Sequence, residues 1–178
     1  MKALALLLMS LALPVWAQDW KLDSGKSQVR FVIKQMNVPI EGGFKRFLAQ
    51  AAFDPAKPEA GHFRVDVDTA SVDSGSPEGD DEVKRPAWFD VKAHPWATFV
   101  AKSVRRDGEG RFTAIGDLSI KGVSRPLAVP FGLTRQGGGW LAQGRFPLLR
   151  SAYGIGSGDW ADVVADGLEV RFSLVLLP

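Results

Sequence analysis

The chain of 178 residues contains no cysteine, two histidines and a single tyrosine. Without cysteine, disulfides, thiol chemistry and thiolate metal sites are excluded. The two histidines, His62 and His94, make a poor metal set, although carboxylates could supplement them. The formal net charge is only +2, so there is no electrostatic reason to expect binding to nucleic acid or to an anionic membrane surface.

Long apolar runs are missing as well, except at the beginning of the chain. An apolar run from Ala3 to Leu13 follows Lys2, and Ala17 precedes polar Gln18. The run is too short to span a bilayer, which needs about 20 apolar residues, and its pattern is typical of an export signal cut after Ala17. A buried N-terminal helix is the alternative. We therefore expect a signal peptide at 1–17, one domain at 18–178 and a periplasmic location.

Catalytic motifs are scarce. Residues 154–158, Gly-Ile-Gly-Ser-Gly, lack the strand–turn–helix setting of a nucleophile elbow. They also lack the βαβ unit that a dinucleotide site needs. Asp159 and Asp162 are better explained by a turn. His94 with Asp90 is the acid–base pair on which a hydrolase or isomerase hypothesis would rest. We therefore expect that the protein is not an enzyme and that it binds neither a metal nor a cofactor.

The clearest pattern lies between residues 112 and 133, where apolar residues recur two or four positions apart. They are Phe112, Ala114, Leu118 and Ile120, and then Leu127, Val129, Phe131 and Leu133. Polar residues occupy most of the positions between them. A period of two with one apolar face is typical of an antiparallel sheet that covers a core on one side.

Similar alternation predicts about eight strands in all. They lie near residues 29–33, 47–53, 63–69, 96–104, 111–121, 126–135, 140–148 and 168–176. We expect residues 42–44 to break the first strand and residues 150–162 to form a loop. From 78 to 93 the period becomes helical, Pro77 suits a helix start, and Pro86 prevents one long helix. Eight antiparallel strands can form a sandwich or a barrel, and the pattern favours neither.

Aromatic residues are abundant, with eleven Phe and six Trp spread over nearly every predicted element. They fit a well-filled core, because aromatic rings dominate core energetics. They fit an apolar ligand pocket equally well. Composition does not separate the two interpretations.

Several motifs, taken in order, resemble those of the YceI-like family. Residues 116–126 read GDLSIKGVSRP and resemble the family signature G-x-L-T-I-K-G-V-T-R-P. Further matching segments are Trp88-Phe89-Asp90-Val91, His94-Pro95, Thr98-Phe99, Phe53-Asp54-Pro55 and residues 150–156 with Trp160. The match covers essentially the whole chain after residue 17.

The resemblance implies an all-β fold, an eight-stranded antiparallel lipocalin-like barrel with a short helical insertion, exported to the periplasm. Family members are described as binding polyisoprenoids, quinone tails or fatty-acid derivatives inside the barrel, with no chemistry on the ligand. Some are encoded with b561-type membrane cytochromes. The alternative is therefore an accessory module for such a membrane protein, with a filled core. A long tail can exceed the interior of one small barrel, so the two arrangements expected for it are a homodimer or an open barrel end.

On this hypothesis the rings point inward around a lipid tail. The predicted ligand-binding residues are Phe31, Phe44, Phe47, Phe53, Trp88, Phe89, Phe99, Phe112, Leu118, Phe131, Phe146, Arg150, Tyr153, Trp160 and Phe172. Among them, Trp88 and Phe89 would close one end. A polar head group would sit near Arg150 and Tyr153. Lys121 and Arg125 are interpreted as solvated turn residues.

Overall fold

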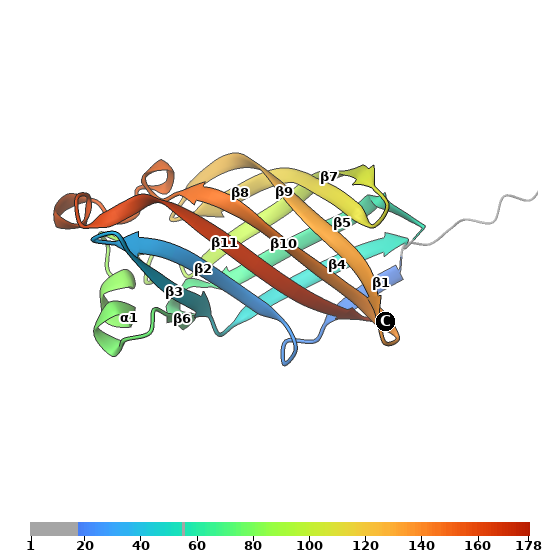
Figure 1. Ribbon diagram of the computed structural model, residues 1–178, viewed down its shortest axis with the longest axis horizontal. Coiled ribbons are helices and arrows are strands. Elements are labelled where there is room, and N and C mark those ends of the chain that lie inside the picture. Colours follow the sequence, from blue (N-terminus) through green and yellow to red (C-terminus); the bar gives the residue numbers. More distant parts are fainter. Residues whose placement is uncertain (1–17, 55) are drawn as a thin grey trace, which may run out of the picture.

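The computed structural model describes residues 18–54 and 56–178, so the predicted signal peptide lies outside the described residues (Figure 1). Its strands are β1 (Gln18–Leu22), β2 (Gln28–Gln35), β3 (Val38–Phe44), β4 (Phe47–Asp54), β5 (Lys57–Asp68), β6 (Val72–Asp73), β7 (Trp96–Gly108), β8 (Arg111–Ile120), β9 (Val123–Gln136), β10 (Gly139–Leu149) and β11 (Val164–Leu177). The helical elements are α1 (Pro77–Val83) and the short 3-10 turns η1 (Thr69–Ser71), η2 (Ser151–Tyr153) and η3 (Gly158–Trp160).

The sheet closes on itself. Strand β1 pairs with β4 on one side and with β11 on the other, so the ring β1-β4-β5-β7-β8-β9-β10-β11 is complete. Every pairing in it is antiparallel. Closure removes the exposed strand edges of an open sheet. The predicted eight-stranded antiparallel barrel is therefore confirmed, and the sandwich is excluded.

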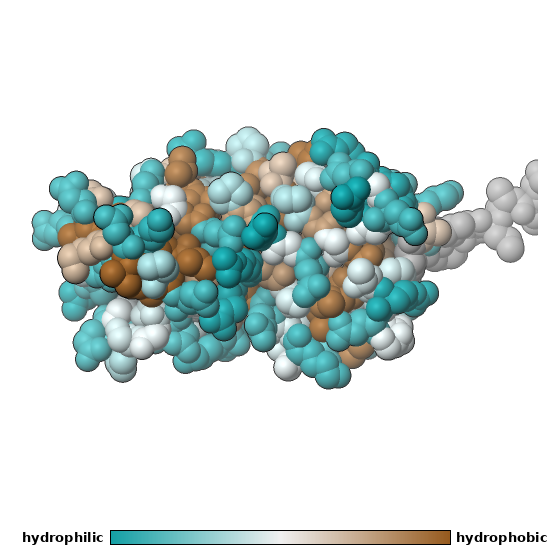
Figure 2. Space-filling view, viewed as in Figure 1, coloured by the Kyte–Doolittle hydropathy of each residue, from teal (hydrophilic) through white to brown (hydrophobic). Residues whose placement is uncertain are grey.

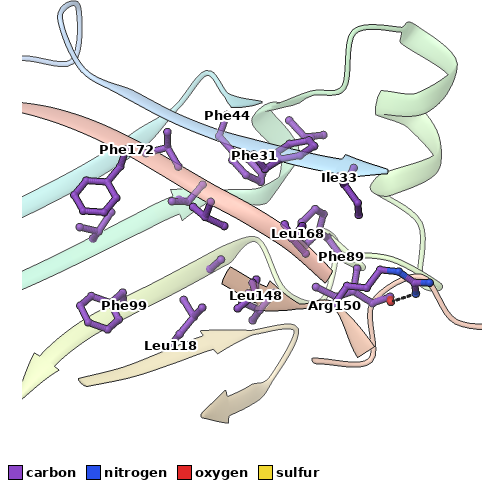
Figure 3. Close-up of a pocket in the computed structure, with 18 of the residues that line it drawn as sticks. Phe31, Ile33, Phe44, Phe89, Phe99, Leu118, Leu148, Arg150, Leu168 and Phe172 are labelled. Carbon is purple, nitrogen blue, oxygen red and sulfur yellow. Dashed lines mark hydrogen bonds between the residues drawn. The ribbon is translucent and has the colours of Figure 1, made fainter. Parts of the chain in front are cut away.

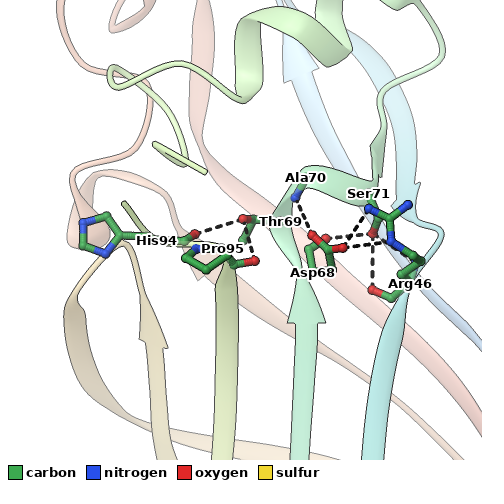
Figure 4. Close-up of polar contacts among 7 residues, drawn as sticks. All are labelled: Arg46, Asp68, Thr69, Ala70, Ser71, His94 and Pro95. Carbon is green, nitrogen blue, oxygen red and sulfur yellow. Dashed lines mark hydrogen bonds and ion pairs between the residues drawn. The ribbon is translucent and has the colours of Figure 1, made fainter. Parts of the chain in front are cut away.

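The remaining strands continue three of the wall strands after a break. Strand β2 follows β1 in the chain and pairs with β11. Strand β3 precedes β4, and β6 follows β5 and pairs with β3. Polar side chains satisfy the backbone groups at one break (Figure 4). There the Arg46 N–H donates to Ser71 Oγ at 3.0 Å, and the Ala70 N–H donates to the Asp68 carboxylate at 2.9 Å.

Strand β3 corrects a prediction. Residues 42–44 do not break the sheet but pair with β2, in register from Gln35↔Val38 to Val29↔Phe44. A Cβ on Gly42 would collide with the Phe31 ring, so glycine here makes room for an inward ring. The turn before β3 is formed by Met36 and Asn37, both with positive φ, as tight hairpins require.

The predicted helical insertion is present as α1. Ser76 is its N-cap, and its Oγ accepts from the Gly79 N–H at 3.0 Å. Pro77 occupies the first turn, where its missing N–H costs nothing. The helix lies beside one end of the barrel, close to the β2–β3 hairpin (Figure 1).

The two ends of the barrel interior differ. At the end that β1 closes, six rings, here called the aromatic plug, fill the lumen: Trp20, Phe53, Phe63, Phe112, Phe131 and Trp140. Trp20 stacks on Phe53 at 5.3 Å between centroids, and Phe53 stacks on Phe63 at 5.5 Å. The end beside α1 is hollow, and it holds the candidate site.

Candidate functional site

A cavity of about 830 Å³ occupies the half of the barrel beside α1. Figure 3 shows rings and aliphatic side chains from opposite walls pointing into it, among them Phe31, Phe99 and Phe172. The volume lies within the range of small-molecule pockets, about 300–1,000 Å³. Phe63 and Phe131 belong to both the plug and the cavity lining, so the plug is the floor of the cavity.

The mouth of the cavity is polar. Its lining residues from α1 and the segments on either side of it are Ser74, Ser76, Glu78, Gly79, Asp81, Glu82, Val83 and Arg85. Glu82 accepts from Trp160 Nε1 at 2.8 Å and lies 3.1 Å from Arg85 Nη1. On the face shown in Figure 2, hydrophobic residues gather over the region where β2 and β11 approach α1. An apolar chamber with a polar rim suits a ligand that has a long apolar part.

Eleven of the fifteen predicted residues line the cavity. They are Phe31, Phe44, Trp88, Phe89, Phe99, Leu118, Phe131, Phe146, Arg150, Trp160 and Phe172. Trp88 and Phe89 lie at the helical end, as predicted. Contact with a ligand stays a prediction for each of them.

The other four are buried elsewhere. Phe53 and Phe112 belong to the plug, and Phe47 is buried in the same core cluster. Tyr153 is 3% exposed and packs in the cluster around Trp88, where burial raises the pKa of its phenol. Inward orientation was therefore foreseeable from alternation, but the depth along the barrel axis was not.

Sequence reasoning missed the aliphatic part of the wall. It consists of Val29, Ile33, Ile40, Val65, Val67, Leu148, Leu168 and Val170, with further small residues. Many of these lie two positions from a predicted ring on the same strand, as Ile33 does from Phe31 and Leu148 from Phe146. The same period of two could have found them.

Arg150 lines the cavity but is not free to bind a head group. Its guanidinium donates to six carbonyl oxygens, those of Ile155, Gly156, Trp160, Ala161, Val164 and Ala165. The side chain is 5% exposed. A guanidinium has five N–H donors, so these carbonyls engage all of them. Arg150 therefore clamps the loop after β10, and Figure 3 shows it at the helical end of the cavity.

Trp88 contrasts with Arg150 in its hydrogen bonding. Its indole Nε1 is buried and has no hydrogen-bond partner among the described residues. A buried donor without a partner is costly.

Lys121 lies in the turn between β8 and β9, as predicted, whereas Arg125 is an exposed residue of β9. Both side chains also make contacts that the prediction did not include. Lys121 Nζ donates to the carbonyls of Pro86 and Gly154 at 2.6 and 2.8 Å. Arg125 Nε donates to the Ala152 carbonyl at 2.6 Å. Both side chains lie across the surface and bind segments far away in sequence, which alternation along one strand does not reveal.

His94 does not belong to the described cavity lining. Its carbonyl accepts from Thr69 Oγ1 at 3.0 Å, and its N–H donates to the Asp90 carbonyl at 2.8 Å. Figure 4 shows its ring directed away from Thr69, and the ring lies against Gly122. The contacts of His94 are thus those of a residue that joins the α1 segment to β7.

The described residues contain no group of three or more His, Asp or Glu side chains placed to hold a metal ion. None of the helices in this part of the chain combines the length and apolar character needed to cross a membrane.

Comparison with known proteins gives consistent matches. The family model described as the YceI-like domain matches residues 20–176. A "UPF0312 protein" of Ectopseudomonas mendocina (strain ymp) is 35% identical over 133 residues, which cover 71% of this chain and 70% of that protein. A "UPF0312 protein" of Azotobacter vinelandii is 34% identical over 116 residues, but the match spans only 60% of its length.

Two solved structures are similar over most of the chain. BcnA of Burkholderia cenocepacia is 41% identical, with a TM-score of 0.83, and the match covers 86% of this chain and 98% of that one. A polyisoprenoid binding domain from Saccharophagus degradans is 16% identical with a TM-score of 0.71, over 92% of this chain and 99% of that one. At that identity the second match shows the shared fold.

Proposed function

The chain belongs to the YceI-like domain family, and from this premise we propose that its barrel binds a long apolar molecule and carries it without changing it chemically. The ligand class is a polyisoprenoid, a quinone with a prenyl tail, or a fatty-acid derivative. The polyisoprenoid binding domain of Saccharophagus degradans, which shares the fold, supports the first of these.

The observation that carries the proposal is the cavity itself. About 830 Å³ of barrel interior is enclosed by rings and aliphatic side chains rather than filled by them. Burying a tail is worth about 0.8 kcal/mol per CH₂, so a chain of ten or more carbons gains several kcal/mol from such a lining. The same gain explains why the ligand would need a carrier in an aqueous compartment. We place that compartment in the periplasm, because residues 1–17 read as an export signal.

Ligand occupancy is the first test. The protein, purified from its native host, is examined by native mass spectrometry and then delipidated and offered geranylgeraniol or decylubiquinone. Trp88 and Trp160 line the cavity, so uptake should change tryptophan fluorescence. A ligand-free mass under gentle conditions, together with no uptake of either probe, would exclude the carrier function.

A matched pair of variants locates the bound probe. Ala49 lines the cavity, whereas Leu48, its neighbour in β4, points outward and is 57% exposed. Ala49→Phe fills part of the cavity and should weaken binding of geranylgeraniol at least tenfold. Leu48→Phe should bind as the unaltered protein does. Equal binding by both variants would place the probe elsewhere.

An accessory role beside a membrane protein, such as a b561-type cytochrome, is the second candidate. The observation that favours it is the tip of the β2–β3 hairpin, where Met36 is 75% and Val38 is 62% exposed. Ile33, Gln35 and Ile40 of the same hairpin line the cavity. Pull-down from native membranes should then recover a partner that persists after delipidation, and Met36→Asp should abolish its recovery.

A further inference from the structure

The barrel wall lacks a hydrogen-bond ladder over half of the boundary between β9 and β10. Their register begins at Gln136↔Gly139 and, in the part of the chain that the structure describes, stops at Phe131↔Gly144. Over the rest, β9 stays paired with β8 and β10 stays paired with β11. We call the boundary between residues 123–130 and 145–149 the seam.

Proline explains the β9 side of the seam. Successive residues of a strand direct their backbone groups to opposite neighbours. The Leu133 N–H donates to the Gly110 carbonyl, on the β8 side, at 2.8 Å. Odd-numbered residues of β9 therefore face β8, and even-numbered ones, including Pro126 and Pro130, face β10. Proline has no N–H to donate, so both positions withhold a donor from the seam.

The β10 side follows the same rule. The Arg150 N–H donates to the Asp166 carbonyl, on the β11 side, at 3.0 Å. Odd-numbered residues of β10 therefore face β9, and Pro147 is one of them. Within sheets, proline is confined to positions where the missing N–H faces no partner strand. Three prolines on two strands thus make this boundary a pair of unpaired strand edges in the barrel wall.

Side chains, rather than a ladder, connect the two sides of the seam at its helical end. Arg125 Nε donates to the Ala152 carbonyl at 2.6 Å, and Lys121 Nζ donates to the Gly154 carbonyl at 2.8 Å. Both carbonyls lie in or next to η2, which follows β10. These contacts can open by side-chain rotation, because no backbone hydrogen bond has to break.

The seam backs directly onto the cavity. Val129 of β9 and Phe146 and Leu148 of β10 all line it. The ladder between β5 and β7 is also incomplete, since it ends at Arg64↔Val100. Phe63 and Arg64, beside that second gap, also line the cavity, and an ion pair of 3.1 Å between Arg106 and Glu59 crosses the gap. The seam differs from it in having proline on both of its strands.

We infer that the seam is a lateral portal through which the apolar tail of the ligand enters and leaves the barrel. The strands β9 and β10 part at Pro126, Pro130 and Pro147, and the Arg125 and Lys121 contacts act as its latch. A side entrance spares a long tail from threading end-on past the polar mouth. This inference rests on the proposed function, because it presumes a ligand in the cavity.

A covalent bridge tests the portal after folding is complete. The chain has no cysteine, so Ala128→Cys with Arg145→Cys, both exposed on opposite sides of the seam, provides a unique pair for a bismaleimide. Thr134→Cys with Gln143→Cys bridges the same strands where they are already paired. Release of pyrene-labelled hexadecanoic acid is timed by stopped-flow fluorescence. We expect at least tenfold slower release with the seam bridge, and an unchanged rate with the control bridge.

The possible results distinguish failure of the portal hypothesis from failure of the proposed function. If the seam-bridged protein binds and releases the probe at the unbridged rate, the portal is wrong and the mouth beside α1 is the route. If the unbridged protein takes up neither this probe nor geranylgeraniol nor decylubiquinone, the proposed function itself fails. Arg125→Met should speed release several-fold without lowering the melting temperature. Arg145→Met, which removes an exposed arginine outside the latch, should leave the rate unchanged, and equal rates for the two variants would exclude the latch.

Discussion

The Arg150 guanidinium donates to the Val164 carbonyl oxygen at 2.6 Å, across 14 residues of sequence, from a side chain that is 5% exposed. The same guanidinium binds the carbonyls of Ile155 and Gly156. A buried cation of this kind is tolerated because the carbonyl dipoles replace its water shell. One side chain therefore fixes the whole loop between β10 and β11.

Arg150→Met should be strongly destabilising, because it leaves those carbonyls without donors. We expect a loss of about 3–5 kcal/mol in the free energy of unfolding, measured by urea titration. Arg150→Lys should recover only part of it, since an ammonium cannot reproduce the planar fork of donors. A Met variant as stable as the unaltered protein would contradict the clamp.

Substitutions of Phe53 and Phe172 should affect protein stability and probe binding to different degrees. Phe53 is fully buried in the plug, whereas Phe172 borders the cavity. Phe53→Ala should cost about 3–5 kcal/mol, the usual range for a core ring, with little effect on probe affinity once the variant is folded. Phe172→Ala should cost less and alter affinity more, because it enlarges the chamber. Thermal denaturation and fluorescence titration measure the two effects, and a reversed order would mean that the plug and the cavity are misassigned.

Gly116 should tolerate no side chain. Its added Cβ would collide with the Val100 carbonyl on β7, whereas a Cβ on Gly138 meets nothing within 4 Å. We expect Gly116→Ala to cost about 2–4 kcal/mol through strain in the β7–β8 pair. Gly138→Ala should stay within about 0.5 kcal/mol of the unaltered protein. Chemical denaturation of both variants is the measurement, and equal stability would show that β7 can move aside.

Asp166 should make the barrel sensitive to acid. The Ser151 N–H and hydroxyl each donate to its carboxylate at 2.8 Å, and these bonds lower the pKa of Asp166. Because the folded-state pKa lies below the unfolded value, about 3.9, the stabilisation is complete above that value and disappears as the pH falls through the lowered pKa.

Asp166→Asn should therefore be less stable than the unaltered protein at pH 7, and the difference should shrink below about pH 4. Urea midpoints measured between pH 7 and pH 2.5 give the comparison. Asp162→Asn, which removes an exposed carboxylate from the neighbouring loop, is the control and should change little at any pH. A difference for Asp166→Asn that persists to pH 2.5 would contradict the assignment.

The fold was predictable because its main signal is local. The alternation between residues 112 and 133 marks an apolar face wherever the strands end up, and the structure pairs Phe112 with Phe131 across β8 and β9. Ser76 and Pro77 mark the start of α1 in the same local way. The pattern was less informative at Gly42 and Gly43, where glycines in a paired strand look like a break.

The sequence by itself determined that strands with one apolar face form this domain, that cysteine chemistry is absent, and that rings such as Phe112 and Phe131 belong to the apolar face of their strands. Only the tertiary structure decided which rings fill the barrel and which enclose space, because that depends on depth along the barrel axis, and a period of two carries no depth. Barrel closure likewise arises from β1 reaching both β4 and β11. The roles of Arg150, Lys121 and Arg125 depend on carbonyls that only folding brings within hydrogen-bonding distance.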